Sequence, residues 1–248
     1  MTKVMLITGA SRGIGAATAR LAATQGYTLC LNYQRQRATA DALAEEIIAA
    51  GGQAITVQAD VADESQVLQL FAHIDQRFGR LDVLVNNAGI LETQMRLEQM
   101  ELARWQRVFA TNVFGSFLCC REAIKRMSTR QGGNGGAIVN LSSAAARLGS
   151  PGEYIDYAAA KGAIDSMTLG LSKEVAADGI RVNAVRPGVI ATEIHASGGE
   201  PERVARVSQG VPMGRGGLAS EVAEAILWLA SEQASYTNGA LLDVSGGR

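Results

Sequence analysis

Short, almost wholly apolar runs alternate along this chain with longer stretches of amphipathic, helical composition. The first two apolar runs are residues 3–7 and 29–33. Continuous apolar runs of this kind are typical of parallel strands that are buried on both faces. Because the alternation continues through the chain, the sequence predicts an α/β fold: a single Rossmann-type, doubly wound parallel sheet with helices on both faces.

The expected elements follow one another in a regular order. Strands are expected at residues 3–7, 29–33, 54–58, 81–86, 137–141, 180–185 and 240–244. Helices are expected at residues 14–25, 38–50, 64–78, 102–127, 155–177 and 219–230. No Pro- or Ser-rich linker divides the chain, so residues 1–248 are expected to form one domain.

Composition and charge exclude several other classes of protein. With 47% hydrophobic and 19% charged residues the chain can build a sizeable core. A net charge of -1 without a basic stripe argues against a nucleic-acid partner. No apolar run reaches the ~20 residues of a membrane helix, and no signal-peptide pattern opens the chain. The three cysteines (Cys30, Cys119 and Cys120) form no C-x-x-C pair, so a reducing, cytoplasmic location is expected.

A glycine-rich segment, TGASRGIG, joins the first strand to the first helix. Glycines at such a junction let the backbone approach a pyrophosphate, and the helix N-terminus offers free N–H groups and a positive dipole end. A tight helix-entry turn alone could produce the same glycines. The position at the first strand–helix junction favours cofactor binding by the following residues: Gly9, Ser11, Arg12, Gly13, Ile14 and Gly15.

The residues after the second strand favour NADP(H) over NAD(H). NAD-binding sites of this kind carry an acid there, whereas this stretch continues from Tyr33 to Arg35 and Arg37 without one. Guanidinium groups, including that of Arg12 in the glycine segment, would bind a 2'-phosphate. The alternative is that Arg35 and Arg37 are ordinary solvated residues at a helix start.

Candidate cofactor-binding residues also follow the next two strands. Asp60 and Val61 come after the third strand, where Asp60 could bind an adenine amino group or cap the following helix. The fourth strand ends in an Asn-Asn-Ala-Gly segment, which could form a wall beside the cofactor or an ordinary turn. Its candidate binding residues are Asn87, Ala88 and Gly89.

Tyr157 and Lys161 are the candidate acid/base pair. They lie four residues apart near the start of a predicted helix, hence on one helical face. A nearby ammonium stabilises a phenolate and lowers the tyrosine pKa. Tyr154 lacks such a partner, because Ala158 stands four residues after it. A surface Tyr/Lys pair without catalytic function is the alternative.

Two serines and one asparagine are further candidate site residues, each with two possible roles. Ser142 and Ser143 end the fifth strand and could orient a substrate carbonyl or make local backbone bonds. Asn112 stands in the middle of a predicted helix, where it could kink the helix or hold a water. His73 and His195 have no partner at a ligand spacing, so no metal site is predicted.

Taken together, these motifs resemble those of the short-chain dehydrogenase/reductase family, in its order and over essentially the whole chain. The matching residues are Thr8-Gly9-x3-Gly13-x-Gly15, Asn86-Asn87-Ala88-Gly89, Asn112, Ser143, Tyr157-x3-Lys161 and Pro187-Gly188-x3-Thr192. The resemblance implies hydride transfer between a nicotinamide and a carbonyl/alcohol pair.

The family resemblance also implies roles for single residues. Tyr157 would exchange the proton with the carbonyl oxygen, and Lys161 would hold the nicotinamide ribose. Ser143 would hydrogen-bond the substrate oxygen, and Asn112 would anchor a water. The remaining nicotinamide contacts would come from Pro187, Gly188, Ile190 and Thr192.

The resemblance leaves the substrate open. The chain resembles 3-oxoacyl-carrier-protein reductases, which implies a 3-oxoacyl thioester or another small ketone as substrate. The alternative is a sugar 1-dehydrogenase. A carrier protein would need a basic patch, and the candidates are Lys125, Arg126, Arg130 and Lys173. Residues 193–217 would form a substrate lid, and a homotetramer is expected. A catalytically silent dinucleotide-binding regulator is the alternative from another class.

Overall fold

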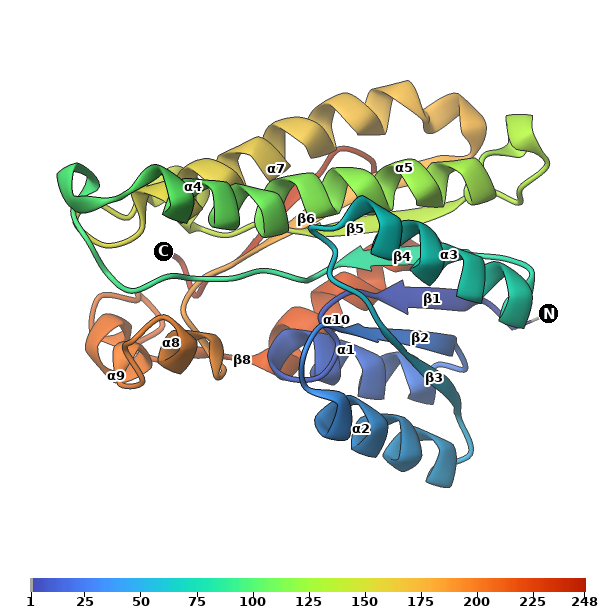
Figure 1. Cartoon of the computed structure of the whole chain (residues 1–248), viewed down its shortest axis with the longest axis horizontal. Helices are drawn as coiled ribbons and strands as arrows, with labels where there is room; N and C mark the ends of the chain where they lie inside the picture. The colour runs from blue at the N-terminus through green and yellow to red at the C-terminus, as the bar shows by residue number, and fades with distance from the viewer. Residues whose placement is uncertain (1) are drawn as a thin grey trace.

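The computed structural model describes residues 2–248 and is built around one parallel sheet (Figure 1). Its seven strands lie in the order β3-β2-β1-β4-β5-β6-β9, and all neighbouring pairs are parallel. Their bounds are β1 Val4–Ile7, β2 Thr28–Tyr33, β3 Gln53–Gln58, β4 Val83–Asn86, β5 Gly136–Leu141, β6 Ile180–Pro187 and β9 Leu241–Val244. The predicted doubly wound Rossmann-type sheet is therefore confirmed.

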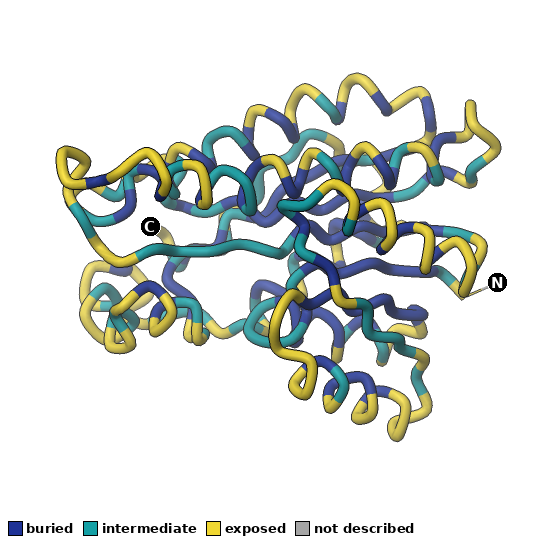
Figure 2. The backbone as a smooth tube through the Cα atoms, in the orientation of Figure 1, coloured by how far each residue is buried: buried dark blue, intermediate teal, exposed yellow. Residues whose placement is uncertain are grey.

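Helices cover both faces of the sheet. One face packs against α1 (Gly13–Thr24), α2 (Arg37–Ala49) and α10 (Ala219–Ala230). The other packs against α3 (Glu64–Phe78), α5 (Gly115–Met127) and α7 (Ile155–Glu174). Alternate strand residues enter opposite cores, as Met5 and Leu6 of β1 do. The five central strands are accordingly mostly buried, whereas the edge strands β3 and β9 are partly exposed and the helices expose their outer sides (Figure 2).

The helix expected over residues 102–127 is interrupted. It consists of α4 (Leu102–Phe109), a π-helical segment (Ala110–Phe114) and α5. Asn112 lies in the π-helical segment with its side chain fully buried. Its Nδ2 donates to the Ile90 carbonyl (3.0 Å) and its Oδ1 accepts from the Ile90 N–H (2.9 Å). This long-range pairing accompanies the widened turn, which is a common cause of helix distortion.

Short elements that the sequence pattern did not predict surround the carboxyl ends of the strands. They are α6 (Ala145–Leu148), β7 (Ile190–Ala191), α8 (Ile194–Ser197), α9 (Arg203–Ser208) and β8 (Gly217–Leu218). β7 and β8 form a separate two-stranded parallel pair. Short 3₁₀ turns lie at Leu97–Gln99, Thr129–Gln131, Ala176–Asp178 and Glu232–Ala234. In Figure 1, α8 and α9 lie to the left of the sheet, on the same side as the start of α7.

Candidate active site

A cavity of about 1250 Å³ opens at the carboxyl ends of the strands. Nearly all of the predicted site residues line it, from both halves of the chain. They are Gly9, Ser11, Arg12, Gly13, Ile14, Arg35, Asp60, Val61, Asn87, Ala88, Gly89, Ser143, Tyr157, Lys161, Pro187, Gly188, Ile190 and Thr192. Gly15, Tyr33 and Asn112 do not line it, and Tyr33 and Asn112 are buried within the fold.

The glycine segment fits closely against the loop that follows β4. Gly9 and Gly13 have φ values of +61° and +56°, in the left-handed region that favours glycine. A Cβ on Gly9 would lie 2.9 Å from Cα of Ala88, and one on Gly15 would lie 2.6 Å from Nδ2 of Asn87. Gly15 therefore serves close packing beneath the loop rather than direct contact with the cavity.

Asn87 fixes the position of this glycine segment. Its Nδ2 donates to the carbonyl oxygens of Thr8 (2.8 Å) and Gly9 (2.9 Å). In return, the Thr8 hydroxyl accepts the N–H groups of Asn87 and Ala88, each at 3.0 Å. The segment after β4 is thus a brace for the glycine turn and also a wall of the cavity.

The N-terminus of α1 points its amides toward the same cavity without a capping side chain. Arg12 occupies the N-cap position but makes no side-chain cap bond, and the first turn holds no acid. Unpaired N–H groups at a helix start bind anions well. The Arg12 guanidinium donates to the Ser197 hydroxyl at 3.1 Å, which links the cavity wall to α8.

Arg35 and Asp60 lie at the far end of the cavity from Tyr157 in the sheet order, next to β2 and β3. Arg35 is exposed. Asp60 accepts from the Ala62 N–H (2.9 Å) and from Nε2 of Gln34 (2.7 Å). The cap of α3 is Asp63, which accepts from the Ser65 and Gln66 amides. Asp60 is therefore not the helix cap that the sequence offered as its alternative role.

Tyr157 and Lys161 lie together at the opposite end, with Nζ of Lys161 5.5 Å from the tyrosine ring centre. The same Nζ donates to the Leu141 carbonyl at 2.6 Å. Burial raises the pKa of Tyr157 to about 12, against the opposing effects of the Ser143 hydroxyl and the Arg203 charge. Burial lowers the pKa of Lys161 to about 8, against the opposing effect of the Asp165 carboxylate.

The two serines after β5 have different surroundings. The Ser142 hydroxyl is buried and donates to the Lys161 carbonyl at 3.1 Å, which ties β5 to α7. The Ser143 hydroxyl accepts from the Ala145 N–H at 3.1 Å and lies close enough to Tyr157 to lower its pKa. Ser143 is the serine of the pair that acts on the tyrosine.

A charged cluster that the sequence did not predict lines the cavity beside Tyr154. Arg203 of α9 donates to Glu153 (2.6 Å) and Glu200 (3.0 Å), and its guanidinium lies 4.8 Å from the Tyr154 ring centre. Arg206 binds the same two glutamates. The spacing of three between the arginines was visible in the sequence, but Glu153 joins them only in the folded chain.

The sheet and this cavity define the class: a Rossmann-type dinucleotide-binding oxidoreductase with a tyrosine–lysine pair. Residues 9–248 match the model of the family described as enoyl-(acyl carrier protein) reductase. An uncharacterized oxidoreductase of Escherichia coli K12 is 59% identical, with 99% of each chain covered. A 3-oxoacyl-[acyl-carrier-protein] reductase of Synechocystis is 42% identical, covering 99% of this chain and 96% of the relative.

A solved structure agrees with these relatives. A mutant of a Serratia marcescens short-chain dehydrogenase/reductase superposes with a TM-score of 0.91 at 34% identity, covering 99% of this chain and 97% of the other. This chain belongs to the short-chain dehydrogenase/reductase family, and it is an oxidoreductase of that type. Within residues 2–248, no helix combines the length and apolar character that crossing a membrane requires.

Proposed function

We propose that this protein is an NADP(H)-dependent reductase of small ketones or 3-oxoacyl thioesters, reversible as an alcohol dehydrogenase. The observation that carries the proposal is the convergence of Ser143, Tyr157 and Lys161 on the cavity that also contains the glycine segment. A regulator that only senses a dinucleotide needs none of these three side chains.

The residues present fit a nicotinamide dinucleotide. The uncapped start of α1 and the glycine turn form a cradle for a pyrophosphate. Gly9 lets this turn lie against the loop after β4, because a Cβ there would lie 2.9 Å from Cα of Ala88. Lys161 would hold the nicotinamide ribose, and the carboxamide would be held by Ile190 and Thr192. When bound, this group supplies or accepts the hydride.

The side chains of this protein supply the proton transfer. During reduction the Tyr157 hydroxyl donates its proton to the carbonyl oxygen, while Ser143 hydrogen-bonds the same oxygen. During oxidation the Tyr157 phenolate accepts the alcohol proton. The charged Lys161 beside the ring stabilises that phenolate, which burial alone disfavours.

The preference for NADP(H) rests on two cations. Arg35 is exposed on the cavity wall and Arg12 stands at the start of α1. A 2'-phosphate can receive charge-assisted hydrogen bonds from both guanidinium groups. The acid that binds a ribose hydroxyl in NAD-dependent relatives of this fold is replaced by Gln34 and Arg35 at this strand end.

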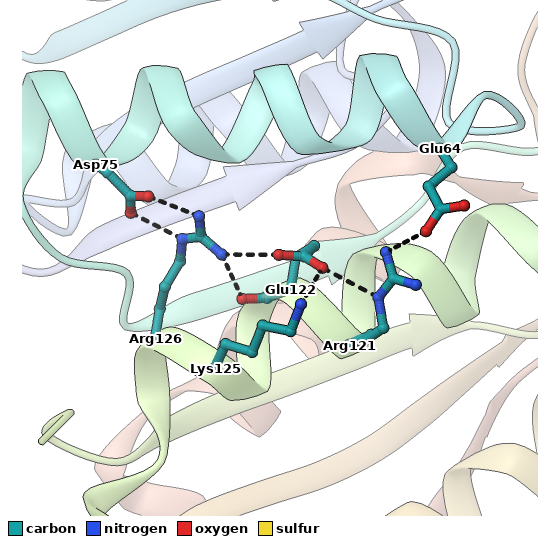
Figure 3. Close-up of polar contacts among 6 residues, drawn as sticks. All are labelled: Glu64, Asp75, Arg121, Glu122, Lys125 and Arg126. Atoms are coloured by element: carbon teal, nitrogen blue, oxygen red, sulfur yellow. Dashed lines mark hydrogen bonds and ion pairs between the residues drawn. The ribbon is translucent and has the colours of Figure 1, made fainter. Parts of the chain in front are cut away.

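The surface near α5 supports free substrates over carrier-bound ones. Arg126 is bound to Asp75 and to the buried Glu122, and Lys125 is bound to Glu122 as well (Figure 3). Arg130 pairs with Asp178 at 2.8 Å. Three of the four cations of the candidate patch are thus matched by carboxylates of this chain, which weakens attraction to an acidic carrier.

We further propose a cytoplasmic homotetramer. The cysteines support a reducing location, because all three are buried free thiols and burial raises their pKa values, that of Cys30 to about 12. Exposed apolar residues on α5 and α7 support association, since such a face is costly in water.

The test is titration of the purified protein with NADPH and NADH, followed by a carbonyl panel monitored by nicotinamide absorbance. The panel includes a 3-oxoacyl thioester, simple diketones and, in reverse, glucose. We expect tighter binding of NADPH, loss of that preference in Arg35→Ala, and turnover of a ketone. Preference for NADH would contradict the assignment of Arg12 and Arg35, and NADPH binding without any turnover would favour the regulator.

A further inference from the structure

Three polar side chains form a column along one face of α7, because Tyr157, Lys161 and Asp165 are spaced four residues apart. Tyr157 and Lys161 line the cavity, whereas Asp165 lies one turn behind Lys161 and outside the lining. Its side chain is only 12% exposed. Nothing in the mechanism above uses this buried carboxylate.

Asp165 is held from one side only. Arg186 of β6 donates to its Oδ2 from Nη2 at 2.8 Å and from Nε at 3.1 Å. Its other oxygen, Oδ1, is buried and has no hydrogen-bond partner among residues 2–248. Burying a carboxylate oxygen without a hydrogen-bond partner costs folding free energy. We therefore expect a nearby cation to interact electrostatically with this oxygen.

Lys161 is that cation. It is buried, and its one hydrogen bond from Nζ among the described residues goes to the Leu141 carbonyl. Burial lowers its pKa to about 8, while the charge of Asp165 acts in the opposite direction. With a value this close to neutrality, a small change in the surroundings alters the fraction of charged lysine.

The other charges on elements packed against α7 are occupied elsewhere. The π-helical segment and β5 carry no charged residue. Arg181 of β6 donates to backbone carbonyls, including that of Leu229 at 2.7 Å. The remaining pairs are Arg104–Asp156, Arg107–Glu92, Arg147–Asp243, Arg130–Asp178 and Arg203 with Glu153 and Glu200. Asp243 also lies 3.9 Å from Nη1 of Arg186, a longer contact than the 2.8 Å bond of Arg186 to Asp165. Asp165 is therefore the carboxylate that acts on Lys161.

We propose that Asp165 is a positioning residue whose buried carboxylate keeps the Lys161 ammonium charged, and that Arg186 limits how much of this field reaches Lys161. The effect of Asp165 on the charge of Lys161 does not depend on the proposed function. Its effect on turnover rests on the proposed function, because Lys161 matters to the reaction only if Tyr157 is the acid/base.

The test is a titration of Lys161 by NMR of protein labelled with carbon-13 at the lysine ε carbons. Assignment is simple, because the other lysines are Lys3, Lys125 and Lys173, and Lys161→Met removes the signal of interest. The variants are Asp165→Asn, Arg186→Met and the double variant. The double variant removes both buried charges, so it remains informative where a single variant fails to fold.

We expect four ordered pKa values for Lys161. Arg186→Met gives the highest, followed by the unaltered protein, the double variant and Asp165→Asn. The drop in Asp165→Asn should be about one pKa unit, or roughly tenfold in the charged-to-neutral ratio at a given pH. Identical titration of Lys161 in all variants that fold would overturn the proposal.

Activity gives a second, separable readout. The alkaline limb of the pH profile of kcat/KM should move in the same order as the Lys161 titration. A merely structural role would lower kcat without moving this limb. If the unaltered protein turns over no substrate, the proposed function fails while the NMR order still decides the role of Asp165.

Discussion

At the scale of single residues, Tyr157 and Tyr154 provide a matched pair. Both line the cavity, but among residues 2–248 the Lys161 ammonium lies over the Tyr157 ring, whereas the Arg203 guanidinium lies over the Tyr154 ring. We expect Tyr157→Phe to lose ~10²–10⁴-fold in kcat, as removal of a general acid/base does. NADPH affinity, measured by fluorescence titration, should be kept.

The control is Tyr154→Phe, which removes only the hydroxyl of the neighbouring tyrosine, keeps its ring and should change kcat little. Equal losses in both variants would show that loss of a hydroxyl from either tyrosine disturbs the site, and would contradict a proton transfer specific to Tyr157.

Some site residues could be predicted from neighbours in the sequence, whereas others depend on contacts that form only in the folded chain. Tyr157 and Lys161 could be predicted because their spacing on one helix brings them together whatever the rest of the chain does. Arg203 could not, because it reaches Tyr154 and Glu153 only after α9 has folded against the segment before α7. The partner of Asn112 was equally hidden, since Ile90 lies 22 residues before it.

Gly15 and Gly162 differ in whether the fold leaves room for a side chain. A Cβ on Gly15 would lie 2.6 Å from Nδ2 of Asn87 and from the Gly9 carbonyl, whereas one on Gly162 meets nothing within 4 Å. Gly15→Ala should therefore destabilise the protein by ~1–3 kcal/mol and weaken NADPH binding. Gly162→Ala in α7 should stabilise it by about 0.5–1 kcal/mol.

Thermal unfolding with and without NADPH measures both effects. An unchanged Tm and cofactor affinity in Gly15→Ala would mean that the loop after β4 yields easily, against the bracing role given to Asn87.

At the scale of elements, acidification should release α9 from the segment before α7. Burial raises the pKa of Glu153, but hydrogen bonds from Arg203 and Arg206 outweigh it, so the net pKa is lowered. The pKa of Glu200 is lowered mainly by Arg206. Groups with depressed folded-state pKa values stabilise the contact above their ordinary value of about 4.5 and lose that contribution as pH falls.

Hydrogen exchange measures this release. Protection of amides in residues 200–208 should fall below about pH 4.5 while that of β1 and β4 persists. Glu200→Gln should weaken the protection already at neutral pH. Loss of protection in α9 and the sheet together would show that α9 does not unfold as a separate unit.

Element boundaries followed the local signals. The helices expected over 64–78 and 219–230 have those bounds in the structure, and α3 is capped by Asp63 and ended by Gly79 in the left-handed conformation. The helix expected over 102–127 contains a π-helical segment because Asn112 pairs with a distant backbone, which no local pattern encodes. The short elements between β6 and α10 are too short to show a helical or strand period in the sequence.

At the scale of the whole molecule, a bare apolar face predicts association. Phe114, which ends the π-helical segment, is 58% exposed, Phe117 in the first turn of α5 is 49% exposed, and Leu169 is exposed on α7. We expect a homotetramer in analytical ultracentrifugation, and Phe117→Asp should shift it to smaller species, since a buried unpaired charge is costly.

The matched control is Leu68→Asp on α3, where an apolar residue of similar exposure lies on another helix. It should leave the sedimentation unchanged. A monomeric unaltered protein, or equal effects of both variants, would contradict this interface.

The two ends of the chain are unequal as points of attachment. Arg248 lines the main cavity, and its backbone oxygen accepts from Arg147 at 2.9 Å. The chain enters β1 at the other end of the sheet (Figure 1). A fusion partner or surface linker joined after Arg248 would therefore crowd the mouth of the cavity. A linker joined at the amino end would leave the cavity open. The end chosen for attachment can therefore decide whether an immobilised protein still admits its substrate.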